Sequence, residues 1–159
     1  MYSPSRLDRS CLPTSDHYFC SIIRSSISLI SLTANGTGGS FSVDANTANG
    51  PIDISFPSAP VNSVLNFGAQ TANAPAHAYL HKTYEGTFDL RTSFFATAAI
   101  DFDNRVEDPA GRGRYRIVEN YSAGTGTASG KVVWRDAQVN RETGSVRLVS
   151  SNAGVSLKL

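Results

Sequence analysis

The chain has few charged residues, only two cysteines and no long apolar run. Of its 159 residues, 17% are charged and 40% are hydrophobic, and the formal net charge is +1. Disordered chains combine low hydrophobicity with high net charge, and this chain has neither property. Proteins that bind nucleic acid through counterion release carry a strong basic excess, so the near-neutral charge argues against a nucleic-acid partner. The length fits a single domain with a buried core.

The two cysteines and the longest apolar stretch all lie near the start of the chain. Cys11 and Cys20 do not make a disulfide framework, so a local disulfide and two free thiols both stay open. Residues 18–32 are largely apolar but are rich in serine and carry Arg24 in their middle. A spanning helix needs about 20 apolar residues, so we expect no transmembrane span. The layout also does not match a secretory signal peptide.

The character of the sequence changes near residue 27. Residues 1–26 hold prolines, serines and charges without a hydrophobic period, which predicts an irregular or disordered leader. Residues 27–159 consist of short runs that alternate apolar and polar positions between Asn, Gly and Pro turns, a pattern typical of a single all-β domain. The residues expected to point inward from these strands are Phe41, Val43, Ala45, Ile52, Ile54, Phe56, Leu65, Phe67, Ala69, Ala76, Ala78, Leu80, Phe88, Leu90, Val132, Trp134, Val146, Leu148, Val155, Leu157 and Leu159.

A turn motif recurs along the chain. Residues 47–51 read TANGP, residues 71–75 read TANAP, residues 150–154 read SSNAG, and residues 33–36 repeat the opening TANG. Repeats of about 20–50 residues are typical of solenoids, because a unit that cannot bury its own face stacks on the next. The sequence therefore predicts a β-solenoid-like stack of short strands and Asn/Gly/Pro turns, with a β-sandwich as the alternative.

Several of these segments resemble an uncharacterised fungal family of adhesin-like, repetitive β domains found mainly in mushroom-forming species. The similarity rests on the T-x-N-G/A-P turns, PSAPVNSVL (57–65), YEGTFDLRTSFF (84–95), VEDPAGRGR (106–114) and GKVVW (130–134). It covers roughly residues 27–159. The resemblance implies a repetitive β fold and no particular activity or cofactor. We therefore expect a non-enzymatic, adhesin-like structural or binding module, acting at the cell surface.

Residues 101–116 are the charge-rich part of the chain and the best candidate for a ligand site. Four carboxylates here lack the spacing of an EF-hand calcium loop. Two carboxylates acting on a glycosidic bond give the alternative function, a carbohydrate-binding or carbohydrate-cleaving domain. Intermixed arginines favour a solvated loop with internal ion pairs. The candidate ligand-binding residues are Asp103, Asp108, Arg112, Arg114 and Tyr115, with Arg116 as a further partner for an anion or a sugar acid.

The histidines predict no metal site. His77, Tyr79 and His81 alternate along one strand and are all expected to face outward. Side chains four positions apart on a strand start roughly 13 Å from each other, so both histidines cannot bind one zinc ion. We expect no metal ligands and no catalytic residues.

Two glycosylation sequons suit a secreted or cell-surface protein. They begin at Asn35 and Asn120, both in expected turns. The chain ends on the strand VSLKL, so Leu159 is expected to lie on an unpaired edge that favours self-association. Besides a cell-surface glycan, a second copy of the chain is therefore a candidate partner, and an intracellular scaffold that pairs through strand edges is a third reading.

Overall fold

The protein is all-β in the part of the chain that its computed structural model describes. That part comprises residues 10–14, 17–23, 38–135 and 143–159, and it contains strands and turns but no helix. The twelve strands are Ser10–Thr14 (β1), His17–Ile23 (β2), Ser40–Thr47 (β3), Ile52–Ser55 (β4), Val64–Thr71 (β5), Ala76–Tyr79 (β6), Gly86–Arg91 (β7), Ala98–Asp101 (β8), Arg116–Gly124 (β9), Thr127–Trp134 (β10), Gly144–Ser150 (β11) and Val155–Lys158 (β12). The all-β class expected from the alternating pattern is confirmed.

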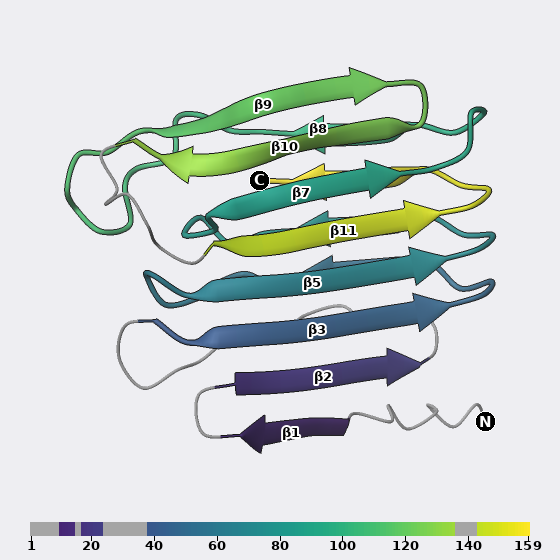
Figure 1. Cartoon of the computed structure of the whole chain (residues 1–159), viewed down its shortest axis with the longest axis horizontal. Helices are drawn as coiled ribbons and strands as arrows, with labels where there is room; N and C mark the ends of the chain where they lie inside the picture. Colours follow the sequence, from purple (N-terminus) through teal and green to yellow (C-terminus); the bar gives the residue numbers. More distant parts are fainter. Residues whose placement is uncertain (1–9, 15–16, 24–37, 136–142) are drawn as a thin grey trace, which may run out of the picture.

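The strands form one large and one small sheet, and neither sheet closes on itself. The large sheet has the order β1-β2-β3-β5-β11-β7-β10-β9, and it fills the front of Figure 1. Its five strands from β2 to β7 run parallel. β1 pairs antiparallel with β2 at one end, and β10 pairs antiparallel with both β7 and β9 at the other. The small sheet, β4-β6-β12-β8, is entirely parallel and lies behind the large one. From β3 to β8, each strand of the large sheet is followed by a strand of the small sheet. The chain therefore comes back to the large sheet in the same direction each time, which makes the pairing parallel.

The hydrophobic core lies between the two sheets. Strand after strand shows alternating burial, as in β4 and β11, because successive side chains point to opposite faces. All residues expected to point inward are buried, except that Leu80 is half-buried against the core. Phe56 and Phe67 meet edge to face across the layers, with ring centroids 5.2 Å apart. The period-two pattern therefore identified the core correctly.

The recurring turn motifs stack on one another and form an asparagine ladder. The Nδ2 of Asn73 donates to Oδ1 of Asn49 at 2.7 Å, and the Nδ2 of Asn152 donates to Oδ1 of Asn73 at 2.6 Å. Backbone hydrogen bonds join the same turns, because Asn73 N donates to Ala48 O and Asn152 N donates to Ala72 O. The sequence repeat therefore corresponds to a structural repeat. The copy at residues 33–36 lies outside the described residues.

The stacking order differs from the order of the sequence. In a solenoid each unit stacks on the next unit of the chain. Here the unit β11–β12 lies between β5–β6 and β7–β8, because β11 pairs with both β5 and β7 while β12 pairs with both β6 and β8. The expectation that Leu159 lies on an unpaired edge is therefore wrong. β12 has two neighbours, Leu159 is buried, and its backbone N–H donates to Asp101 O.

Two strands lie within the segment expected to be an irregular leader. β1 and β2 form an antiparallel pair, and β2 continues the parallel sheet alongside β3. The apolar and aromatic residues of Tyr18–Ile23 suit a strand, which explains this departure from the expectation of an irregular segment. The backbone register places Cys11 opposite Cys20, while their side chains lie outside the described residues. Among the described residues, no helix has the length and apolar character needed to cross a membrane.

The asparagine ladder makes the central asparagine the most costly to remove. Asn73 both donates and accepts, whereas Asn49 and Asn152 each take part in one bond of the ladder. Because a neutral hydrogen bond contributes about 1 kcal/mol, we expect Asn73→Ala to lower the free energy of unfolding by about 1–2 kcal/mol. Asn49→Ala and Asn152→Ala should each cost about half as much. Urea denaturation measures all three, and equal losses at the three positions would contradict the ladder.

Candidate functional site

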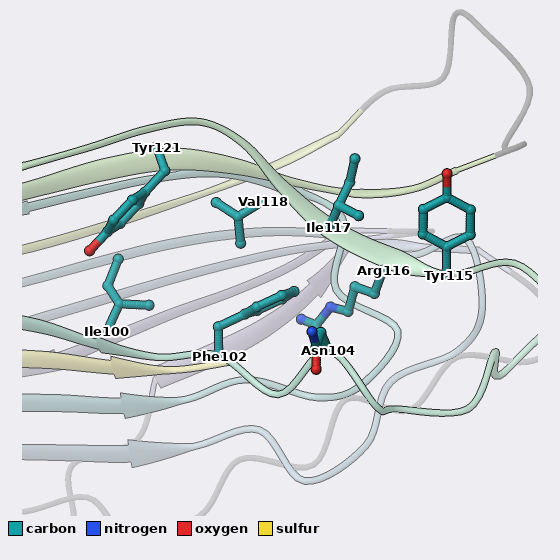
Figure 2. A pocket seen from close by; sticks show the side chains of 8 residues that line it. All are labelled: Ile100, Phe102, Asn104, Tyr115, Arg116, Ile117, Val118 and Tyr121. Atoms are coloured by element: carbon teal, nitrogen blue, oxygen red, sulfur yellow. The ribbon is translucent and has the colours of Figure 1, made fainter.

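The best-formed pocket lies where the large sheet extends beyond the small one. β10 of the large sheet packs against β8, which is an edge strand of the small sheet. β9 lies one strand further out, so its inner face extends past the small sheet. The chain after β8 runs beneath this face (Figure 2). The unequal number of strands in the two sheets therefore leaves a recess at this edge.

The recess is a pocket of about 490 Å³ with a mainly apolar lining. Figure 2 shows Arg116, Val118 and Tyr121 of β9 on the side that faces Ile100 and Phe102, while Tyr115 points away from Arg116. The lining residues are Ile100, Phe102, Asn104, Tyr115, Arg116, Ile117, Val118 and Tyr121. Pockets of this size and composition are typical of small-molecule sites.

A β-bulge turns Tyr121 toward the pocket. The register between β9 and β10 shifts so that Asn120 and Tyr121 together lie opposite Gly130, and Asn120 has a φ of 52°. Without the extra residue, the alternation that points Arg116 and Val118 inward would turn Tyr121 outward. Gly130 fits here because a Cβ atom would come within 2.7 Å of the Phe88 ring. The local backbone therefore determines one wall of the pocket.

Arg116 is the one charged residue of the lining, and no group in the described part of the chain accepts a hydrogen bond from it. The residue is 1% exposed, and its Nε, Nη1 and Nη2 atoms are all buried without a partner. Its guanidinium lies 5.5 Å from the centroid of the Phe102 ring, a cation–π contact. Burial lowers the pKa of Arg116 from its ordinary value to about 10, so the side chain stays positively charged at neutral pH.

His81 and Tyr84 form a buried polar cluster within reach of the charge on Arg116. His81 is 2% exposed, its Nδ1 contacts Thr83 Oγ1 at 2.6 Å, and its ring meets that of Tyr84 edge to face at 6.1 Å. Burial and then the charge of Arg116 lower the pKa of His81 from 6.5 to about 4. Burial raises the pKa of Tyr84 above its usual value of about 10, and its hydroxyl donates to Thr87 O. The imidazole is therefore neutral at physiological pH.

The expectation that His81 faces outward is wrong. β6 ends at Tyr79, and the chain then turns so that Tyr84 N donates to His81 O. The alternation that would expose His81 therefore stops two residues before it. His77 does lie on the outer face, half-buried, with Nδ1 2.5 Å from Ser156 Oγ. Within the described ranges, no group of three or more His, Cys, Asp or Glu side chains is placed to hold a metal ion.

Two of the candidate ligand-binding residues, Asp108 and Arg114, bind each other. The guanidinium of Arg114 donates to both carboxylate oxygens of Asp108, at 2.8 and 3.1 Å, and also lies 3.6 Å from Glu85 Oε1 and 5.5 Å from the Trp134 ring centroid. The backbone N–H groups of Ala110, Arg112 and Arg114 also donate to the Asp108 carboxylate. The hydrogen bond from Arg114 is the main reason that the pKa of Asp108 falls well below its usual range. Both side chains therefore hold the loop together.

The left-handed conformations of Gly111 and Gly113, with φ of 64° and 68°, allow the loop to turn its amides toward Asp108. The hydrogen bond with Asp108, together with the charges of Asp108 and Glu85, holds the pKa of Arg114 above its usual value. The expected internal ion pair of this loop is thus present, although Arg114 is buried rather than solvated.

The other candidates lie on the surface around this loop. Asp103 is exposed and its Oδ1 accepts the backbone N–H of Arg105. Arg112 is exposed, and Tyr115, which is 52% exposed, borders the pocket. Asn120 lies within β9 and not in the expected turn, although it is exposed as a glycan would require. Asn35 lies outside the described residues. The candidate residues therefore do not gather around one point.

Sequence reasoning missed most of the pocket. It named Tyr115 and Arg116 but not Ile100, Phe102, Val118 or Tyr121. One signal was present, because the alternation that points Val118 inward also points Arg116 inward, and a cation at a core position needs a partner. The bulge that redirects Tyr121 left no comparable signal. Comparison with known protein families, with curated proteins and with solved structures finds no match to this chain.

The Asp108 carboxylate should be the main support of the loop. We expect Asp108→Asn to lower the melting temperature several-fold more than Asp103→Asn, because Asp103 accepts only one backbone amide whereas Asp108 accepts three and an arginine. The difference should shrink as the pH falls below 3.8, because the unfolded carboxyl then takes up a proton that the folded Asp108 carboxylate, with its lowered pKa, still excludes. Thermal unfolding measures both variants. Similar losses at neutral pH would refute this role for Asp108.

His81 should make the protein less stable as the pH falls from 6.5 to 4. In that range the unfolded chain binds a proton on the imidazole that the folded protein excludes, so up to about 3 kcal/mol of stability is lost. His81→Asn should flatten this part of the profile measured by urea denaturation. Ile54→Val, a core change costing about 1 kcal/mol, is the control that should lower stability equally at each pH. An unchanged slope in His81→Asn would contradict the assignment.

Proposed function

We propose that the protein is a non-enzymatic binding module that holds a small, largely apolar ligand in the pocket between β8 and β9. The observation that carries this proposal is the pocket itself, about 490 Å³ in volume and walled by Ile100, Phe102 and Val118. Its lining contains one charged side chain and no pair of carboxylates, whereas a glycosidase needs two carboxyl groups flanking the bond. The lining therefore suits a site that binds a ligand better than a site that catalyses a reaction.

The adhesin-like setting is part of the same proposal. Rungs β3–β4 and β5–β6 stack in parallel register, as the coils of a solenoid do, which supports a solenoid-like repeat for this part of the chain. Asn120 is exposed on the pocket strand β9 and suits a glycan on a surface protein. Edge strands β8 and β9 offer free backbone groups for contact with a second copy.

A carbohydrate ligand is the second candidate, and two exposed aromatic side chains favour it. Tyr115 is 52% exposed and Tyr121 is 56% exposed, and both border the pocket. Tyrosine rings combine an apolar face with a polar hydroxyl, which suits contact with a sugar ring. Arg112 and Asp103 are exposed in the adjacent loop and would supply hydrogen bonds. In this case substitution of Arg112 or Asp103 would abolish retention on insoluble glucan or chitin.

Filling the pocket tests the proposal. Ile100→Trp should weaken binding of the neutral fluorescent probe N-phenyl-1-naphthylamine about tenfold or more, since the indole takes the probe's place. The matched control is Ala99→Trp, because Ala99 is the preceding residue of β8 and lies on its exposed outer face. Fluorescence titration gives both dissociation constants. Equal affinities of the two variants, or no saturable binding to the native protein, would reject the pocket as a binding site.

A further inference from the structure

We infer that the ligand of this pocket is an amphipathic monoanion, an acyl or aryl compound whose carboxylate pairs with Arg116. This inference rests on the proposed function, because it names the chemical class of ligand for the same pocket. Its basis is the meeting of a buried cation and an apolar wall. The three nitrogen atoms of the guanidinium are buried and have no hydrogen-bond acceptor among the residues that the structure describes. Arg116 belongs to the lining of the pocket together with Phe102 and Asn104 (Figure 2).

A buried cation without a hydrogen-bonded anion is an uncommon and costly arrangement. Charged side chains that are buried are normally paired or hydrogen-bonded, because the protein interior solvates a charge far less well than water does. Arg114 shows the usual solution nearby, since it is buried and bonded to Asp108. Arg116 has no such partner in the described ranges, although it is more deeply buried. The two arginines therefore differ in function, with one serving the loop and the other facing a ligand site.

The neighbouring acidic side chains do not neutralise Arg116. Asp103 is near enough to raise the pKa of Arg116, but its carboxylate is exposed and accepts the backbone N–H of Arg105. The guanidinium lies 5.5 Å from the centroid of the Phe102 ring, a cation–π contact that supplies no carboxylate. Burial still dominates, so the pKa of Arg116 lies below its ordinary value. An anion entering the pocket would supply the hydrogen-bond acceptors that the protein does not.

The lining also indicates what the rest of the ligand is. A guanidinium offers paired N–H donors that match the two oxygens of a carboxylate. Only one cation is present among the lining residues, so a single negative charge balances the site. Ile100, Phe102 and Val118 provide an apolar wall for the body of the ligand, and Tyr121 lies at the exposed side. The arrangement fits a molecule with one anionic end and a hydrocarbon or aromatic remainder.

The test compares two probes that differ by one anionic group. These are 1-anilinonaphthalene-8-sulfonate and the neutral N-phenyl-1-naphthylamine, with the sulfonate standing in for a carboxylate. We expect the native protein to bind the anionic probe about 10–100-fold more tightly, the range of a charge-assisted hydrogen bond. Decanoate should displace the bound anionic probe, whereas decanol at the same concentration should not.

Arg116→Met should remove the preference for the anionic probe and leave binding of the neutral probe intact. Methionine keeps an unbranched side chain in the core but carries no charge. The matched control is Arg147→Met, which removes a cation from the outer face of β11 and should keep the preference. Arg116→Lys, which keeps the charge, should retain part of the preference. Arg116→Met should also melt no lower than the native protein, because it removes an unpaired buried charge.

The outcomes separate this inference from the proposed function. Equal affinity of the native protein for both probes would overturn the anionic ligand and leave the pocket as a binding site. A preference that persists in Arg116→Met would also overturn it, because the anion would then bind elsewhere. If neither probe binds in a saturable way, both the inference and the proposed function fail. The comparison of the two probes on the native protein decides the matter even if Arg116→Met does not fold.

Discussion

Parallel pairing in uninterrupted register is the constraint on which the rest of the structure depends. Along β3, β5, β11 and β7, each inward residue lies beside an inward residue of the next strand, as Val43, Phe67 and Val146 do. A shift of one residue in any pair would turn a whole strand's apolar set toward water. The same register brings the T-x-N turns into line, so the asparagine ladder follows from the pairing of the strands. The core and the turns thus support a single alignment.

The pocket follows from where this regular pattern stops. Rungs of the parallel stack bury their inner faces against each other, but the antiparallel hairpin β10–β9 extends only the large sheet. Its outer strand therefore presents inward-pointing side chains to a segment without a strand, and Arg116 is among them. Folding alone favours an apolar residue at such a position. The retained arginine is consistent with a site in which ligand binding offsets a cost in stability.

Most of the core could be predicted from the sequence, whereas the topology and the pocket could not. Period-two alternation is a local signal, and it identified inward residues from Phe41 to Leu157. It failed at His81, where the strand had already ended, because alternation alone does not indicate strand ends. The position of β12 depends on pairing between distant segments, so the sequence suggested a free edge at Leu159 instead. The site depends on a bulge and on the unequal widths of two sheets, which are both products of tertiary structure.

The insertion of β11 and β12 between earlier strands also determines the order in which the protein can assemble during synthesis. Strands β5 and β7 are made well before residues 143–159, yet each needs β11 as a neighbour. Until that segment leaves the ribosome, two unpaired parallel edges stay open, and such edges invite association with other chains. Contacts between segments distant in sequence also slow folding. The nascent chain therefore passes through a stage in which the β10–β9 hairpin can form locally while the centre of both sheets waits for its last strands.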